Sequence, residues 1–305
     1  MTWLAWRQFR ANAVVAAAAI AAVVVVLAVT RSHVAGVADP DQLSTPYQSL
    51  RLFGTALIGV PAFIGAFWGA PLVARELESG THRLAWTQSV TRRRWLTTKL
   101  AMTAGAAAVV AGAFSAVFTW WSLPFDAFGN RVGTANFGQR GIAPVGYAVF
   151  ALVLGAFAGV VIRRTLPAMA ATLTGFFVVR FSFQLFIRPH LIHPVTATLP
   201  NNLFGQRDVA GAGRWILSSH TVDAAGHVLN NAQIDRLLHD SCRLTDATTK
   251  ADWIRCSESL GIHDVVRMHP ASHFWPLQAW ETATFLMLAL MLAVGSLWWV
   301  RHRIS

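Results

Sequence analysis

Charged residues are scarce in this 305-residue chain. Asp, Glu, Lys and Arg together make up 13% of it, whereas soluble globular domains usually carry about 25%. Hydrophobic residues make up 54%, and they are gathered into long runs. This composition excludes an ordinary soluble globular domain and indicates a membrane protein.

Lysine is rarer still, and neither of the two lysines stands in an ATP-binding P-loop. The only lysines, Lys99 and Lys250, each follow Thr rather than Gly, so the chain lacks the Gly-Lys-Ser/Thr of a phosphate-binding loop. His-Glu-x-x-His and Gly-x-Ser-x-Gly are also missing. We therefore expect no enzyme activity and no cofactor in this chain, and any active transport must draw its energy from another protein. The arginine bias, with the Ala-rich runs, is typical of a GC-rich bacterial genome.

Cysteine occurs only twice, as Cys242 and Cys256, in one polar segment. A disulfide between them is expected if that segment lies outside the reducing cytosol; the alternative is two buried free thiols. Eight histidines lie between His190 and His273. Their spacing fits no metal template, so we expect exposed loop histidines and no metal site.

Six apolar runs are long enough to cross a bilayer, which takes about 20 helical residues. They cover residues 11–30, 52–73, 100–121, 142–162, 166–187 and 282–300. The predicted fold is an all-α membrane protein with six transmembrane helices and a small mixed extracytoplasmic domain between helices 5 and 6. Its parts are an N-terminal interfacial segment with helices 1–5 (1–187), the extracytoplasmic domain (188–275), and helix 6 with a cytoplasmic tail (276–305).

Positive charge in the short loops predicts the topology. Twelve Lys and Arg residues lie on the side that includes both termini, against four on the other side. We expect a multi-pass protein of the bacterial plasma membrane with both termini on the cytoplasmic side. The basic residues flank spans, which argues against nucleic-acid binding. Arg7 and Arg10 before the first run also fit a cleavable signal peptide, but the run exceeds the usual core of about 7–15 residues.

The polar segment of residues 188–275 is expected to fold by itself. Apolar and polar residues alternate in 215–229 around a turn at 223–226, and this pattern predicts a hairpin. Residues 231–239 and 246–260 predict two short helices, with Asp246 as the N-cap of the second.

The connector between the second and third runs, residues 74–99, carries the clearest functional pattern. Gly80 suits a helix C-cap, where the left-handed conformation favours Gly. Thr81 then suits the N-cap of a short helix that contains Leu84 and Trp86, and Thr91 suits the N-cap of the third span.

The connector's charges have several interpretations. Arg92, Arg93 and Arg94 oppose the dipole of the third helix, so they are expected, with Lys99, to contact anionic lipid head groups or a cytoplasmic partner. Glu76 and Glu78 point about 200° apart on a helix. One is expected to pair with arginines of the N-terminal segment and the other to face a partner, unless both are simply solvated.

This connector resembles the ABC-2 class of ABC exporter membrane subunits. In that class a Glu-x-Glu-x-Gly-Thr stretch follows the second span, and Leu, a Val-Ser/Thr-Arg run and a Lys come after it. The matching residues here are Glu76, Glu78, Gly80, Thr81, Leu84, Ser89, Val90, Thr91, Arg92 and Lys99. Ser89 replaces the Pro often found before the Val. Residues 3–10 resemble the interfacial helix of the class.

The resemblance implies that a separate ATPase subunit binds ATP and Mg²⁺ and docks on the connector, and that a second permease subunit, identical or related, completes the pathway. Leu84 and Trp86 are the expected anchors, with Arg83 and either Glu76 or Glu78 as polar contacts. A membrane-anchored sensor or assembly protein that presents the extracytoplasmic domain is the alternative; an intramembrane enzyme is disfavoured by the missing motifs. The sequence does not indicate the substrate.

Arg180 is an unusual charge inside the fifth run. Intramembrane charges usually face a cavity or a partner group. Its side chain is expected either to reach the outer head groups or to pair with Glu281, at the outer end of the sixth run.

Overall fold

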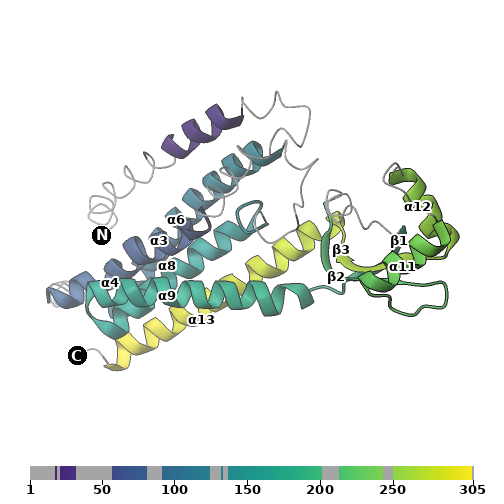
Figure 1. Ribbon diagram of the computed structural model, residues 1–305. Helices are drawn as coiled ribbons and strands as arrows, with labels where there is room; N and C mark the ends of the chain where they lie inside the picture. The colour runs from purple at the N-terminus through teal and green to yellow at the C-terminus, as the bar shows by residue number, and fades with distance from the viewer. Residues whose placement is uncertain are drawn as a thin grey trace. The chain divides into compact units, whose positions relative to one another are not determined.

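The structure, a computed structural model, describes residues 18, 21–31, 57–80, 91–123, 132, 137–200, 213–242 and 250–303. They form two compact units. The helical unit holds the long apolar helices up to Arg188 and from Trp275 onward. The sheet unit holds the described residues of 189–274 (Figure 1).

Five helices of the described part are long and apolar enough to cross a membrane. Their bounds are Leu57–Glu78, Arg92–Ser122, Ala143–Ile162, Thr165–His190 and Ala271–Arg303. A shorter apolar helix spans Ala21–Arg31; most of the rest of the predicted first run lies outside the described residues. The chain is therefore mostly helical with multiple apolar helices, as predicted.

The first of the five helices is a composite. It joins η2 (Leu57–Gly59), α3 (Val60–Ile64), the π-helical η3 (Gly65–Gly69) and α4 (Ala70–Glu78). Pro71, just inside α4, has no N–H, and its ring would clash with the carbonyl group four residues earlier in a regular α-helix. The backbone widens directly before it, and the Ala70 N–H donates to the Gly65 carbonyl, five residues back.

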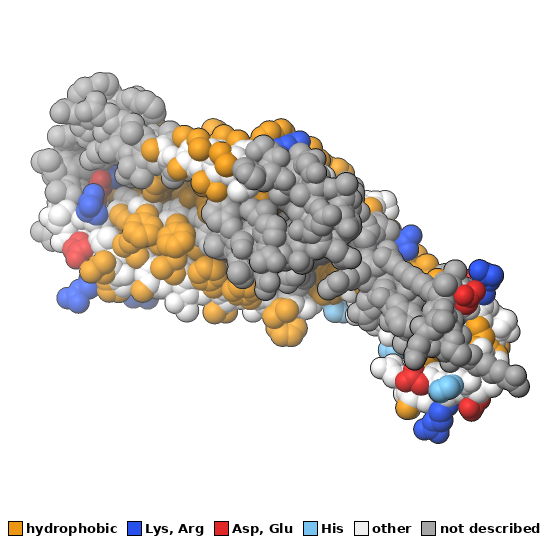
Figure 2. All heavy atoms as spheres, turned by 45° about the horizontal axis from the view of Figure 1, so that its top comes forward, with side chains coloured by type: hydrophobic (Ala, Val, Ile, Leu, Met, Phe, Trp, Pro, Cys, Tyr) orange, Lys and Arg blue, Asp and Glu red, His pale blue; other side chains and the backbone are white. Residues whose placement is uncertain are grey.

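The other long helices are α6 (Arg92–Ser122), α8 (Ala143–Ile162), α9 (Thr165–Ser182) continued by η5 (Phe183–Ile187) and η6 (Arg188–His190), and α13 (Phe274–Arg303). The central helix is α8, which packs against α3, α4, α6 and α9 (Figure 1). Large apolar side chains on the other helices point outward, among them Val109, Leu166 and Phe186. Figure 2 shows such side chains over much of the visible helical surface, which suits helices that face lipid.

Two glycine pairs let the backbones of η3, α4 and α8 touch. A Cβ atom placed on Gly155 of α8 would overlap the Gly65 carbonyl oxygen, and one on Gly69 would overlap the Leu152 carbonyl oxygen. A Cβ atom on Gly159 would lie 2.6 Å from the Ala70 carbonyl oxygen. These small-xxx-small pairs, visible in the sequence, are thus a close helix contact.

The sheet unit contains three antiparallel strands in the order β1-β3-β2: β1 (Val195–Pro200), β3 (His263–His269) and β2 (Trp215–Val222). Val195 lies opposite Met268, and Trp215 opposite His269. The predicted hairpin of residues 215–229 is wrong in its main pairing, because β2 pairs with β3. The chain does fold back at the predicted turn: Val222 bridges to Val228, the Leu229 N–H donates to the Thr221 carbonyl oxygen at 2.8 Å, and the Gly226 N–H donates to the Asp223 carbonyl oxygen at 3.0 Å. Alternation therefore identifies the strand and its turn, but not the partner of the rest of β2.

Two helices complete the sheet unit. The predicted first one is α11 (Asn231–Cys242), and the second is α12 (Lys250–Ser259), while Asp246 lies outside the described residues. Asn230 and Gln233 form a reciprocal capping box, with both bonds at 2.9 Å. A disulfide joins Cys242 to Cys256, with their Cα atoms 6.1 Å apart.

Candidate functional site: the connector base and a buried charge cluster

The described part of the connector ends at Gly80 and resumes at Thr91. Gly80 has φ +73° directly after α4, the left-handed conformation that its sequence position predicts. Thr91 caps α6 as predicted, and its Oγ1 accepts the Arg94 N–H at 3.3 Å. The expected docking residues between these ends, Thr81, Arg83, Leu84 and Trp86, lie outside the described residues.

An ion pair joins the two sides of the connector. Glu76 of α4 accepts a hydrogen bond from the Lys99 ammonium group of α6, and both side chains are partly buried. The Lys99 nitrogen also lies 4.6 Å from the ring centroid of Trp95, within range of a cation–π interaction. Lys99 thus points to Glu76 rather than to lipid head groups. The N-terminal arginines considered as partners of Glu76, Arg7 and Arg10, lie outside the described residues. The facing charge was close by, two turns into α6.

Glu78 lies at the end of α4 and caps another helix. One carboxylate oxygen, Oε2, accepts the Thr165 backbone N–H at 3.0 Å and the Thr165 hydroxyl at 2.7 Å. Thr165 is the first residue of α9, so Glu78 fills a capping role that the sequence before α9 does not supply. Both carboxylates of the connector are therefore engaged within the chain, on opposite sides of α4, as their spacing predicts.

Three arginines form the start of α6. Arg92 is half-buried, and Arg93 and Arg94 are exposed. They lie in the first turn, where they oppose the helix dipole. Their position suits contact with lipid or with a partner, the two roles considered from sequence.

The second candidate site is a charge cluster inside the helical unit. Glu281 of α13 is fully buried, and Arg188 holds it with two hydrogen bonds, Nε to Oε2 at 2.8 Å and Nη2 to Oε1 at 2.7 Å. The Tyr147 hydroxyl of α8 donates to the same Oε1. Such a forked arginine–carboxylate pair is among the stronger polar contacts in proteins.

Arg180 reaches this cluster from α9. Its side chain is 2% exposed, so it does not reach toward the head groups. Its Nη1 lies 3.5 Å from Glu281 Oε1 without a hydrogen bond, and its guanidinium carbon is 4.3 Å from the Tyr147 ring centroid. The structure thus brings Arg180 and Glu281 together, but Arg188 makes the closer pair.

Sequence reasoning missed Arg188 and Tyr147. Arg188 directly follows the fifth apolar run, which placed it in the polar segment, whereas the helical structure continues to His190. Tyr147 is one of only two tyrosines, and it interrupts an apolar run. A polar group in such a run is the signal that would have identified it.

Gln278, one turn before Glu281 on α13, holds the start of α8. Its Oε1 accepts the N–H groups of Ile142 and Ala143 at 3.1 and 2.7 Å, and its Nε2 donates to the Phe137 carbonyl oxygen at 2.8 Å. One buried amide therefore satisfies free donors at the N-terminus of α8. The polar face of α13 fixes both the start of α8 and the end of α9.

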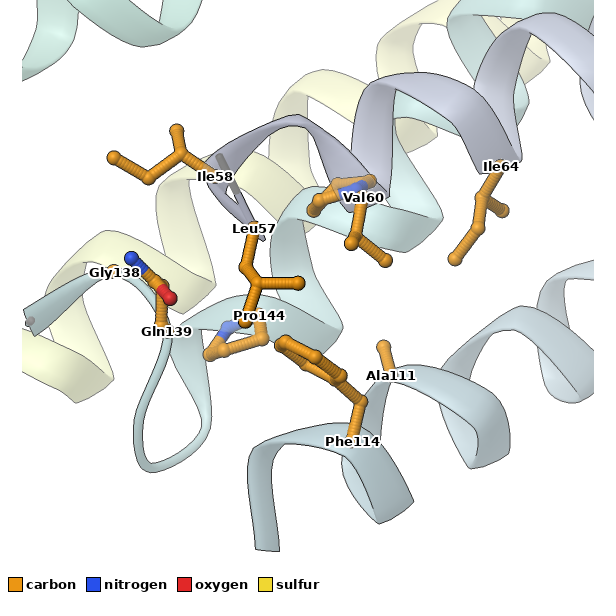
Figure 3. A pocket seen from close by; sticks show the side chains of 10 residues that line it. Leu57, Ile58, Val60, Ile64, Ala111, Phe114, Gly138, Gln139 and Pro144 are labelled. Carbon is orange, nitrogen blue, oxygen red and sulfur yellow. The ribbon is translucent and has the colours of Figure 1, made fainter. Parts of the chain in front are cut away.

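A small cavity lies beside this region. It is lined by residues of η2, α3, α6 and the turn before α8, and Figure 3 shows Leu57, Phe114 and Pro144 gathered around it. Its volume is about 10 Å³, room for one water molecule at most. This cavity is too small for a transported substrate. In the described part of the chain, no group of three or more His, Cys, Asp or Glu is placed to hold a metal ion.

Comparison with protein families matches residues 1–188 to the family described as ABC-2 membrane transporter related. The chain belongs to this family. The match spans the connector, so the resemblance drawn from Glu76 to Lys99 is confirmed. This membership, with several apolar helices, identifies a multi-pass membrane protein and a transporter permease of a family whose ABC transporters include an ATPase partner. Neither the curated proteins nor the solved structures gave a match.

Proposed function

We propose that this chain is the membrane subunit of an ATP-driven exporter in a bacterial plasma membrane. A separate ATPase subunit binds ATP and Mg²⁺ and docks on the connector, and a second permease subunit, identical or related, completes the pathway. Six helices cross the membrane, with both termini in the cytoplasm and the sheet unit outside. The ABC-2 family match across the connector carries this proposal.

The connector base suits the transmission of force. Glu76–Lys99 ties α4 to α6, and Glu78–Thr165 ties α4 to α9. A push on residues 81–90 would therefore act on three helices together. Because both carboxylates are already engaged, we assign docking to Arg83, Leu84 and Trp86 and assign Glu76 and Glu78 to holding the base.

The charge cluster suits a second role in this function. Glu281 joins α8, α9 and α13 through Tyr147, Arg188 and Arg180. In the proposed topology it lies at the outer end of the bundle, opposite the connector. We assign to it the closure of that end in the state seen here.

Copurification tests ATPase coupling. The tagged chain, purified from its native membrane, should bring ATPase activity with it. Changing Leu84 and Trp86 to Asp should remove most of that activity, because two charges would enter an apolar docking contact. Thr87→Asp, in the same connector, is the control and should retain it. If the double variant keeps a coupled ATPase, the docking assignment is wrong.

Accessibility tests the topology separately. Ser79→Cys lies at the connector base and Ser259→Cys lies in the sheet unit, and both positions are exposed. A membrane-impermeant thiol reagent added to intact cells should label Ser259→Cys and leave Ser79→Cys unlabelled until the membrane is opened. The reverse pattern would invert the proposed orientation.

A further inference from the structure

A groove lies between the start of α6 and the end of α13. Its volume is about 600 Å³. Its lining residues are Arg92, Arg93, Val294, Leu297, Trp298, Val300, Arg301 and His302. All belong to the helical unit, and all lie at the connector end of their helices.

The groove is formed by a packed helix contact. Val300 is 2% exposed and belongs to one buried cluster with Trp95, Leu96 and Leu100 of α6, and Leu297 packs against the same cluster. The floor is therefore fixed by the core of the unit. On the open side, Val294 and Trp298 are 57% and 52% exposed.

Apolar and basic side chains occupy different parts of the groove. Val294, Leu297 and Trp298 form its apolar length, and three arginines lie at its end, with His302 beside Trp298, whose carbonyl oxygen is 2.9 Å from His302 Nδ1. None of its lining residues in the described part of the chain carries a carboxylate. The shape and charge fit an amphiphile with a negative head and an apolar tail.

The location selects the occupant. Both walls are candidate membrane spans, and exposed apolar residues continue along α13 from the groove toward the other end of the helix, at Leu286, Met287, Leu290 and Met291. An acyl chain in the groove would stay in apolar surroundings along this face. A phosphate between Arg92, Arg93 and Arg301 would offset their mutual repulsion and, for the first two, their unfavourable position at the α6 dipole.

We propose that this groove binds one phospholipid with a net negative head group, of which phosphatidylglycerol is the simplest probe. The lipid would join the start of α6, next to the connector, to the end of α13. The inference rests on the groove and its charges, and it holds whether or not the chain couples to an ATPase.

Lipid titration of the full-length protein in neutral detergent tests this, with bound lipids counted by native mass spectrometry. One dioleoylphosphatidylglycerol should bind at least tenfold more tightly than dioleoylphosphatidylcholine. Each arginine near an anionic head group contributes about fivefold in affinity, so Arg93→Gln with Arg301→Gln should weaken binding about 25-fold. Arg163→Gln with Arg303→Gln removes equal charge from two exposed helix ends outside the lining, and should change it less than threefold.

A second pair of variants tests the apolar length without altering charge. Val294→Trp fills the groove and should weaken phosphatidylglycerol binding at least tenfold. Val109→Trp is the control, since Val109 is 72% exposed on α6 outside the groove, and it should bind as the unmodified chain does. Equal affinity for the two lipids, or equal effects of groove and control variants, would overturn the proposal. If the groove variants instead lose a copurifying protein while their lipid affinity stays unchanged, the lipid proposal is wrong and the groove belongs to that protein partner.

Discussion

Removing the Glu281 carboxylate should destabilise the helical unit strongly. Glu281→Ala leaves Arg188 and Arg180, which are 0% and 2% exposed, without a counter-charge. Breaking a buried ion pair by deleting one partner costs about 3–5 kcal/mol. For a chain of this size that corresponds to a fall of roughly 10 °C in the unfolding temperature.

The assay is thermal unfolding of the full-length protein in detergent, followed by the fraction that stays monodisperse after heating. Glu258→Ala makes the same chemical change at an exposed position of α12 and is the control, expected to melt as the unmodified chain does. A Glu281→Ala protein that melts with the control would refute the cluster's structural role.

The two arginines should then differ. Arg188→Met removes both hydrogen bonds to Glu281, at 2.8 and 2.7 Å, and should lower the unfolding temperature clearly. Arg180→Met removes a contact at 3.5 Å and one of two positive charges that share a single carboxylate, so it should cost less than about 1 kcal/mol or stabilise. Equal losses for the two variants would contradict this division of roles.

Three further outcomes are expected. Gly155→Ala should cost about 1–3 kcal/mol, because its Cβ would overlap the Gly65 carbonyl oxygen, whereas Gly105→Ala, with open space around it, should be neutral or stabilising in the same thermal assay. Cys256→Ser should lose about 3 kcal/mol in the sheet unit, seen as roughly hundredfold faster proteolysis near α12, with the unmodified chain alkylated only after reduction. Hydrogen bonds from the His227 N–H, the His227 side chain and the Ala225 N–H lower the pKa of Asp223. The stabilisation of the turn by the ionised Asp223 carboxylate is present above about pH 4 and is lost as pH falls through the lowered pKa. Asp223→Ala should therefore speed hydrogen exchange in residues 223–228 at pH 6, but progressively less below pH 4.

The sequence predicts the helices well because bilayer-length apolar runs are a strong local signal. It also predicts the Gly80 conformation and the Thr91 cap, since both depend on the residues immediately around them. The partner of β2 was missed because strand pairing depends on a residue 40 or more positions away, which alternation does not reveal.

The charged partners show the same division between local and distant information. The opposite directions of Glu76 and Glu78 follow from helix geometry, but their partners Lys99 and Thr165 depend on how α4 packs against α6 and α9. Arg188 was assigned to the wrong segment because apolar runs mark the end of a span only to within a few residues.

The glycine contact between η3 and α8 limits how such a transporter can move. Where a carbonyl oxygen of one helix occupies the space of a missing side chain on its neighbour, neither can slide by a residue without a collision. The segment around Gly65–Gly69 and its partner on α8 must therefore travel as one body through a transport cycle. The rearrangement that opens a path has to occur at other helix surfaces, and cross-links placed across this contact should leave transport intact.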